Sequence, residues 1–140
     1  MPTTYTVRPL RIVVVDDCEP FRYTLRKLLT KFPTIEVVGE AADGNSAIEM
    51  ALHLVPDVIT MDVKMPRLNG MEATRRIKRV LSNVHVVAVS SQEDSVTKEA
   101  MTIAGCAAFV TKDCAHTLPE VLTKVTGRPI VKNGFDFPKT

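Results

Sequence analysis

The chain has 140 residues, of which 45% are hydrophobic and 24% are charged, so we expect one soluble domain with a core and no second full domain. Its formal net charge is only +2, with basic residues spread along the chain, which gives no reason to expect direct binding to nucleic acid or to an anionic membrane. Because no run approaches the roughly 20 apolar residues that cross a bilayer, and the first residues lack the apolar core of a signal peptide, we expect a cytoplasmic location.

Short β-branched runs alternate along the chain with longer segments of helical periodicity. The runs are typical of strands and cover residues 11–15, 35–40, 57–61, 84–89 and 107–110. After each run, apolar residues recur at helical spacing: Phe21, Leu25, Leu28, Leu29 and Phe32; Ile48, Leu52 and Val55; Ala73, Ile77, Val80 and Leu81; Val96, Ala100, Ile103 and Ala104; Leu118, Val121, Leu122 and Val125. Strands that are almost wholly apolar are typical of a parallel sheet covered on both faces, so the predicted fold class is α/β with five βα units.

The two ends of the chain lack this periodicity. Residues 1–9 are expected to form a flexible N-terminus and residues 10–126 the domain itself. The last segment, 127–140, reads “GRPIVKNGFDFPKT”; its two prolines and two glycines predict an irregular tail or the stub of a linker.

Two other features have ordinary interpretations. The basic run 75–79, “RRIKR”, lies in a helical segment, which favours a solvated helix face over a docking surface. The three cysteines, Cys18, Cys106 and Cys114, form no C-x-x-C pair and leave an odd count, which favours reduced thiols over a disulfide framework or a zinc site.

Carboxylates follow two of the predicted strands at the point where each strand ends. Asp16 and Asp17 follow the run 11–15, and Asp62 follows the run 57–61. Functional groups in an open α/β sheet gather outside the carboxyl ends of the strands, so the three acids converge if these strands are neighbours. At an effective dielectric of 20, two like charges 4 Å apart repel by roughly 4 kcal/mol, so a cation should lie among them. Oxygen ligands with room for water and phosphate favour Mg²⁺. A helix-cap role for Asp16 or Asp17 alone is the other interpretation.

A hydroxyl and an ammonium group follow the last two predicted strands. Ser90 begins “SSQED” and Lys112 lies in “FVTKD”. Taken singly, a serine here is an ordinary turn former and a lysine an ordinary surface cation. Together with the acids they form a set that suits phosphoryl transfer: a carboxylate that can become an acyl phosphate, a metal ion, a fixed cation and a hydroxyl donor.

These motifs resemble the receiver domains of two-component response regulators. The resemblance covers about residues 10–126, through “VVVDD”, “AADG”, “DVITMDVKMPRLNG”, “VSS” and “GCAAFVTK” in the expected order. It implies a doubly wound, flavodoxin-like sheet of five parallel strands in the order 2-1-3-4-5, with five helices. By matching positions it also implies site roles: Asp62 as phosphoacceptor, Asp17 as direct Mg²⁺ ligand, Asp16 as a ligand acting largely through water, the Lys64 backbone carbonyl as a further ligand, Ser90 and Lys112 as contacts of the phosphoryl group, and Phe109 as the switch aromatic.

The resemblance implies a switch that gains and loses its own phosphoryl group, and not an enzyme acting on a separate substrate. A histidine kinase or phosphotransfer protein would supply the group, and the face of the fourth helix, fifth strand and fifth helix would bind a downstream effector or a second copy. “VVAVSS” and “AAFVTK” are similar to receivers of chemotaxis methylesterases, and “TKD” to those of helix-turn-helix transcription regulators. Asp113 stands where many receivers have proline, which leaves the loop geometry after Lys112 open.

Other functions fit the residues less well. Haloacid-dehalogenase-like phosphatases need a second aspartate two residues after the nucleophile, where this chain has Lys64. No glycine-rich nucleotide loop occurs, and the scattered histidines indicate no hydrolase triad. A receiver-like interaction module that is not phosphorylated stays open as the alternative, although the complete set of acids, Ser90 and Lys112 argues against it.

Overall fold

Strands and helices alternate along the whole described chain. The structure is a computed structural model that describes residues 8–91 and 94–130. The strands are β1 (Leu10–Val15), β2 (Ile35–Ala41), β3 (Val58–Met61), β4 (His85–Ser90) and β5 (Ala108–Thr111). The helices are α1 (Glu19–Leu29), α2 (Gly44–Leu54), α3 (Gly70–Val80), α4 (Ser95–Ala104) and α5 (Leu118–Thr126), with a 3₁₀ helix, η1 (Lys112–Thr117), that the sequence did not predict.

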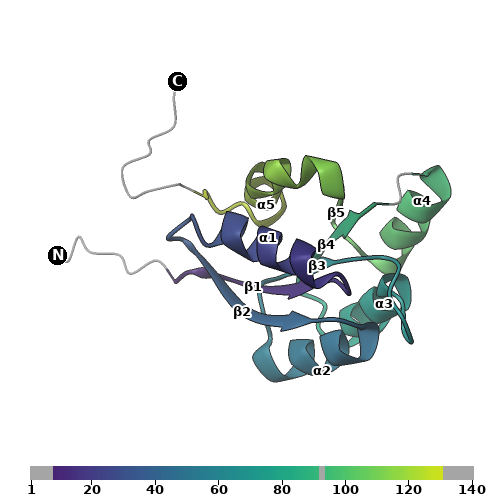
Figure 1. The fold of residues 1–140 in the computed structure, drawn as a ribbon. Helices are drawn as coiled ribbons and strands as arrows, with labels where there is room; N and C mark the ends of the chain where they lie inside the picture. Colours follow the sequence, from purple (N-terminus) through teal and green to yellow (C-terminus); the bar gives the residue numbers. More distant parts are fainter. Residues whose placement is uncertain (1–7, 92–93, 131–140) are drawn as a thin grey trace.

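The five strands form one parallel sheet in the order β2-β1-β3-β4-β5, which confirms the predicted fold class and strand order. Helices α1 and α5 cover one face of the sheet, and α2, α3 and α4 cover the other (Figure 1). The order reverses between β1 and β3, because the chain goes from β1 to β2 on one side and returns to β3 on the other. At such a switch point, the loops that follow the two strands separate and leave room for a ligand.

The core consists of two hydrophobic clusters, one on each face of the sheet. Successive side chains of a strand point to opposite faces, so Val13 and Val15 pack in the cluster under α2, α3 and α4. Ile12 and Val14 pack in the cluster under α1 and α5. The central strand β1 therefore has to be apolar on both faces, and this explains its unbroken run of valines.

Three of the predicted helical stripes face the core only in part. Val96 and Ile103 on α4 are 75% and 81% exposed, Val80 on α3 is 65% exposed, and Leu52 and Val55 at the end of α2 are also exposed. The physical reason is that only part of each stripe points to the sheet, as Ala73 and Ile77 of α3 and Ala104 of α4 do, while neighbouring residues take the other buried positions. The buried side chains are Ala47 and Ala51 of α2, Ala73, Thr74 and Ile77 of α3, and Met101 and Ala104 of α4.

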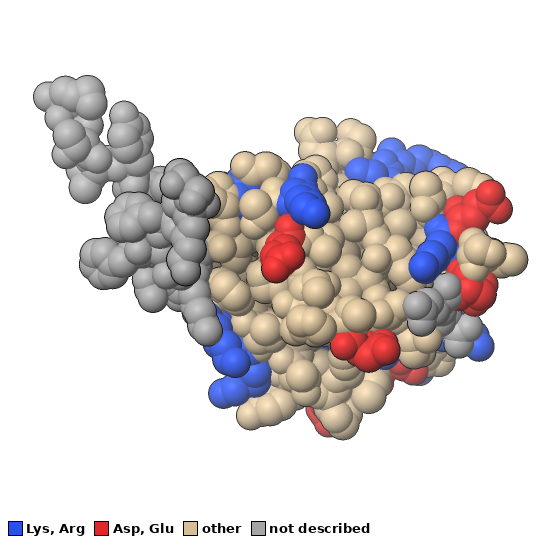
Figure 2. Space-filling model, turned by 90° about the horizontal axis from the view of Figure 1, so that it is seen from above, with Lys and Arg blue, Asp and Glu red and all other residues tan. Residues whose placement is uncertain are grey.

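The basic run on α3 is a solvated helix face, as predicted. Arg75 and Arg76 are exposed and both bond to the carboxylate of Glu72 one turn earlier, and Arg79 is exposed as well. Lys78 alone turns inward and donates to the carbonyls of Ser82 and Val84. On the face of the molecule seen in Figure 2, charged residues of both signs are scattered among uncharged ones and form no extended basic patch.

The thiols of Cys18, Cys106 and Cys114 are all free, in agreement with the prediction of reduced cysteines. Residues 127–130 form no helix or strand, while the remainder of the predicted tail, 131–140, and residues 1–7 of the predicted flexible N-terminus lie outside the described residues. Within the described ranges, no helix is long and apolar enough to span a membrane.

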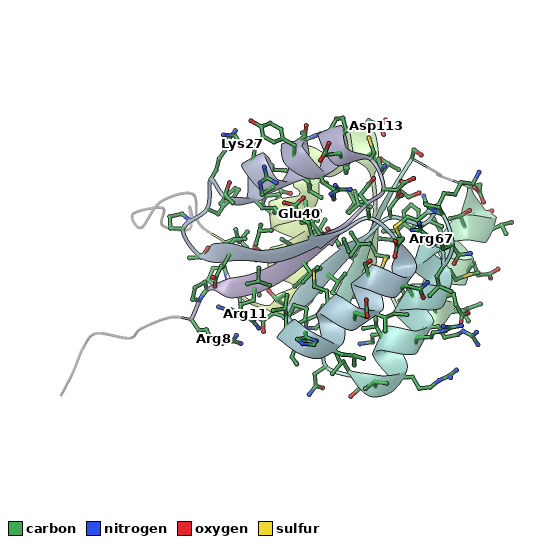
Figure 3. All side chains as sticks on the ribbon, turned by 60° about the horizontal axis from the view of Figure 1, so that its bottom comes forward. Arg8, Arg11, Lys27, Glu40, Arg67 and Asp113 are labelled. Carbon is green, nitrogen blue, oxygen red and sulfur yellow. The ribbon has the colours of Figure 1, made fainter. Side chains whose placement is uncertain are left out.

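A polar cluster around Asp57 closes the end of the sheet that lies opposite the carboxyl ends of the strands. Asp57 accepts hydrogen bonds from the Arg8 guanidinium, at 2.9 and 3.2 Å, and from the Arg11 backbone N–H, at 2.8 Å. Arg128, which follows α5, lies 3.9 Å from the same carboxylate and donates to the Arg8 carbonyl. Burial works to raise the pKa of Asp57, but the Arg11 N–H and the Arg8 charge outweigh it and lower this pKa. In Figure 3, Arg8 and Arg11 lie together at this end, and Arg67 lies at the other.

Candidate functional site

The three predicted acids meet at one edge of the sheet. Asp16 and Asp17 follow β1, Asp62 follows the neighbouring β3, and one carboxylate oxygen from each lies within 4.8 Å of the others. Backbone bonds extend the sheet into both loops, because the Asp16 N–H donates to Ala41 at 3.0 Å and the Asp62 N–H to Val15 at 2.9 Å. Asp16 and Asp62 are only 2% and 4% exposed, whereas Asp17 is exposed. The cluster is thus built from two buried acids and one that faces solvent.

Among the described residues, Lys112 supplies the only fixed positive charge that bonds to the carboxylates of these acids. Its Nζ lies 2.8 Å from Asp16 Oδ2 and 3.6 Å from Asp62 Oδ2, and 4.7 Å from the centroid of the Phe21 ring. The other oxygen of Asp16 accepts from the Cys18 N–H at 2.8 Å. Cys18, not Asp16 or Asp17, is the N-cap residue of α1, so a simple cap role does not explain either acid.

The electrostatics of the cluster leave it short of positive charge. Burial, followed by the charge of Asp16, raises the pKa of Asp62 from 3.8 to about 7, against the opposing effects of Lys112 and the Val63 N–H. Burial works to lower the pKa of Lys112, but its hydrogen bond to Asp16 and the charge of Asp62 raise it overall. Three carboxylates and one ammonium carry two net negative charges when all are ionised, which matches a divalent cation.

Ser90 and Phe109 lie on the two strands beyond β3. Ser90 ends β4, is 1% exposed and pairs in register with Thr111, the residue before Lys112. Phe109 of β5 is half-buried, and the Lys98 Nζ of α4 lies 5.9 Å from the centroid of its ring. Lys64 is exposed in the loop between β3 and α3, two residues beyond Asp62. Ser90 and Lys112 therefore reach the same edge as the acids.

Sequence reasoning missed the role of Gly70, which lies directly against the phosphoacceptor candidate. Gly70 begins α3 and its N–H donates to the Val63 carbonyl at 2.8 Å. A Cβ at this position would lie 1.8 Å from the backbone carbonyl oxygen of Asp62, closer than any real contact. The signal was present in “LNG”, because Asn69 caps the helix that follows it, but the close approach of two backbone segments is invisible in the sequence.

The comparisons with known proteins agree with this fold. Residues 12–125 match the response regulator receiver domain family. The chain belongs to this family of receiver domains. It is 41% identical over 113 residues to a protein-glutamate methylesterase/protein-glutamine glutaminase of Myxococcus xanthus, a match that covers 80% of this chain and 32% of that protein.

Two further relatives show the same relationship. Response regulator GacA of Pseudomonas viridiflava is 38% identical over 103 residues, which cover 74% of this chain and 48% of that protein. The crystal structure of the response regulator domain of Thermotoga maritima CheB superposes with a TM-score of 0.76 at 36% identity, over 86% of this chain and 96% of that one. The chain therefore spans less than half the length of these curated relatives and nearly all of an isolated receiver domain. The acidic triad is of the type that binds Mg²⁺ in receiver domains.

Proposed function

We propose that Asp62 accepts a phosphoryl group from a histidine kinase or a phosphotransfer protein, with Mg²⁺ as cofactor. The observation that supports this best is the triad of carboxylates whose oxygens lie within 4.8 Å of one another, next to the Lys112 ammonium. Asp16, Asp17, Asp62 and the Lys64 backbone carbonyl would hold the metal ion. The donor set consists of oxygens only and carries the charge that a hard divalent cation needs.

In this proposal the chain provides the nucleophile and most of the positioning. An oxygen of the ionised Asp62 attacks the phosphorus, the bond between phosphorus and the donor imidazole nitrogen breaks, and the electron pair stays on the imidazole. Lys112 remains protonated and pairs with the phosphoryl oxygens, and the Ser90 hydroxyl donates to another of them. Mg²⁺, when bound, neutralises charge on the transferring oxygens. Hydrolysis of the acyl phosphate would return the carboxylate.

We further propose that the protein works as a cytoplasmic switch, and not as an enzyme on a separate substrate. The relatives include a methylesterase and a response regulator that are both much longer than this chain, so a receiver of this kind serves different outputs. The partner would be a downstream effector or a second copy of the chain, contacted through α4, β5 and α5. We expect no direct binding of nucleic acid or of a membrane by these residues.

Phosphorylation by a small donor tests the proposed function. Incubation with acetyl phosphate and Mg²⁺ should add one phosphoryl group to the wild-type chain, measured as intact mass, because the donor supplies the phosphoryl group without needing a partner protein. The same incubation with a chelator should add none. If the chain stays unmodified by both acetyl phosphate and histidine kinases while it binds a partner, the alternative of an unphosphorylated interaction module is correct.

The signal would leave the site through Ser90 and Phe109. A phosphoryl group on Asp62 adds charge and acceptor oxygens, which should draw Ser90 inward and let the half-buried Phe109 turn into the space that it leaves. The face formed by α4, β5 and α5 would then change shape. A partner that prefers this shape would shift the equilibrium, and a coupling of about 1 to 3 kcal/mol changes its affinity 5- to 150-fold.

Amide spectra with beryllium fluoride, a mimic of the phosphoryl group, should reveal this switch. We expect shifts around Asp62 that continue through Phe109 into residues 95–126, since these elements are packed together. The Asp62→Asn variant serves as the control and should show no shifts, because the mimic has no carboxylate to bind. Wild-type shifts confined to the loops around Asp62 would leave a phosphate-accepting pocket without the proposed output.

A further inference from the structure

The side chain of Arg22, on α1, contacts the backbone of the acid cluster and not its carboxylates. The side chain is 14% exposed, and its guanidinium donates to the Asp16 carbonyl oxygen at 2.5 Å. A second bond runs from Arg22 Nε to Glu40 Oε1 of β2 at 3.2 Å. A third carboxylate, that of Glu19, lies 4.0 Å from the guanidinium. The proposed phosphoryl transfer uses neither Arg22 nor Glu40, although Arg22 bonds directly to the loop that carries two of the three acids.

The hydrogen bond from Arg22 to the Asp16 carbonyl oxygen fixes the peptide unit that joins Asp16 to Asp17. A peptide unit is planar, so holding the Asp16 carbonyl oxygen also fixes the N–H and Cα of Asp17. The neighbouring peptides are held as well, since the Asp16 N–H donates to Ala41 and the Cys18 N–H donates to the Asp16 carboxylate. Asp17 itself is exposed, and its side chain meets that of Asp62, the other acid proposed to hold the metal ion. The direction in which its carboxylate leaves the chain is set by its backbone, which Arg22 holds.

Glu40 holds the guanidinium of Arg22 on the side of β2. One of its carboxylate oxygens binds Arg22, and the other binds Arg26 one turn further along α1. Figure 3 shows Glu40 on β2, on the side of the strand that faces α1. Because Glu40, with Glu19 at 4.0 Å, draws the guanidinium away from the acid cluster, Arg22 can donate a strong bond to a carbonyl without turning toward the three carboxylates. The net charge of the cluster, which suits a divalent cation, is left intact.

We propose that Arg22, held by Glu40, is a positioning residue that orients Asp17 for the divalent cation. The proposal rests on the proposed function, because it assigns Asp17 as a metal ligand. It goes beyond that function in naming two residues outside the acid cluster that set its metal affinity. Removing an outer partner of a metal ligand typically costs 10- to 100-fold in metal affinity, and we expect an effect at the lower end of this range.

Mg²⁺ titration calorimetry on matched variants tests the proposal. Arg22→Met keeps the aliphatic stem and removes the guanidinium, and it should weaken Mg²⁺ binding about tenfold. Arg26→Met is the matched control: it makes the same change in the same helix at the same glutamate, but within the described chain Arg26 makes no bond to the loop that carries Asp16 and Asp17. Its affinity should stay within about twofold of the wild type. Asp17→Asn gives the reference for complete loss.

Glu40→Gln provides a second route to the same answer. The freed Arg22 guanidinium should turn toward the carboxylates and compete with Mg²⁺, so this single variant should also bind the ion more weakly. Adding Glu40→Gln to Arg22→Met should cost little more, because the two residues act through one bond network. This comparison still decides the matter if Arg22→Met alone does not fold.

Each result has one meaning. Unchanged Mg²⁺ affinity in Arg22→Met, an equal loss in Arg26→Met, or additive losses for Arg22 and Glu40 would show that the network is structural only and would overturn the proposal. In those cases the wild type would still bind Mg²⁺ and accept a phosphoryl group. Failure of the wild type to bind Mg²⁺ would instead remove the metal site itself and both proposals with it. Binding by Asp17→Asn as tight as by the wild type would remove Asp17 from the ligand set and overturn the proposal for Arg22 alone.

Discussion

The Asp62→Asn variant is expected to take up no phosphoryl group from acetyl phosphate and Mg²⁺, measured as intact mass. The amide of asparagine is too weak a nucleophile to form the acyl phosphate, so the loss should be complete. Asp113→Asn is the matched control, because Asp113 is an exposed aspartate next to Lys112 that lies outside the acid cluster. This variant should be modified like the wild type. Full modification of Asp62→Asn would place the acceptor on another residue.

The same Asp62→Asn variant should be more stable than the wild type when no metal is present. With a pKa of about 7 in the folded protein and an ordinary value near 3.8 when unfolded, the folded state binds more protons between these two pH values. The free energy of unfolding of the wild type therefore falls as the pH rises through this window. Asparagine cannot titrate, so the variant should have no advantage near pH 4 and an advantage of up to about 4 kcal/mol above pH 7, at about 1.4 kcal/mol per pKa unit.

Urea unfolding with a chelator, at pH 5 and at pH 8, measures this difference between the two proteins. An equal difference at both pH values would mean that the Asp62 carboxyl has an ordinary pKa. A gain in stability that accompanies a complete loss of phosphorylation is expected for a residue kept in a costly environment because of its chemistry.

Gly70→Ala should cost about 3 kcal/mol of unfolding free energy or more. The added Cβ would lie 1.8 Å from the Asp62 carbonyl oxygen and 3.0 Å from Met61 Cγ. The first of these atoms belongs to the backbone, so relief requires the start of α3 to move away from β3, with loss of packing there. Mg²⁺ affinity should fall with stability, because the displaced backbone carries the Asp62 carboxylate.

Gly127→Ala is the control for this prediction. Gly127 ends α5 with a φ of +71°, and nothing lies within 4 Å of a Cβ built there. Its cost should be only the strain of a left-handed alanine, about 1 to 2 kcal/mol, with no effect on Mg²⁺ binding. Urea unfolding and titration calorimetry compare the two variants. Equal losses in both would show that the start of α3 yields easily and that Gly70 is not a close-packed contact.

The sequence predicted those parts of the molecule that depend on local pattern and on the ends of strands. Asp16, Asp17 and Asp62 could be placed at one edge because the carboxyl ends of parallel strands share it, and side by side because the family resemblance implied that β1 and β3 are neighbours. The exposed Val96 and Ile103 could not be foreseen, since α4 has apolar residues on more than one side and only the packing of Met101 and Ala104 selects the buried one. The hydrogen bond of Arg22 to the Asp16 carbonyl could not be predicted either, because every residue has a backbone carbonyl and the sequence does not show which one a side chain will reach.

The cluster around Asp57 brings together two parts of the chain that are far apart in sequence. Arg8 before β1 and Arg128 after α5 bind the same carboxylate, and Arg128 also donates to the Arg8 carbonyl. The first and last segments of the domain therefore lie side by side, at the end of the sheet away from the acid cluster. Such adjacency is the geometric condition for circular permutation. The domain could be closed near these two arginines by a short linker and opened at an exposed loop elsewhere, with the edge that holds Asp62 left undisturbed.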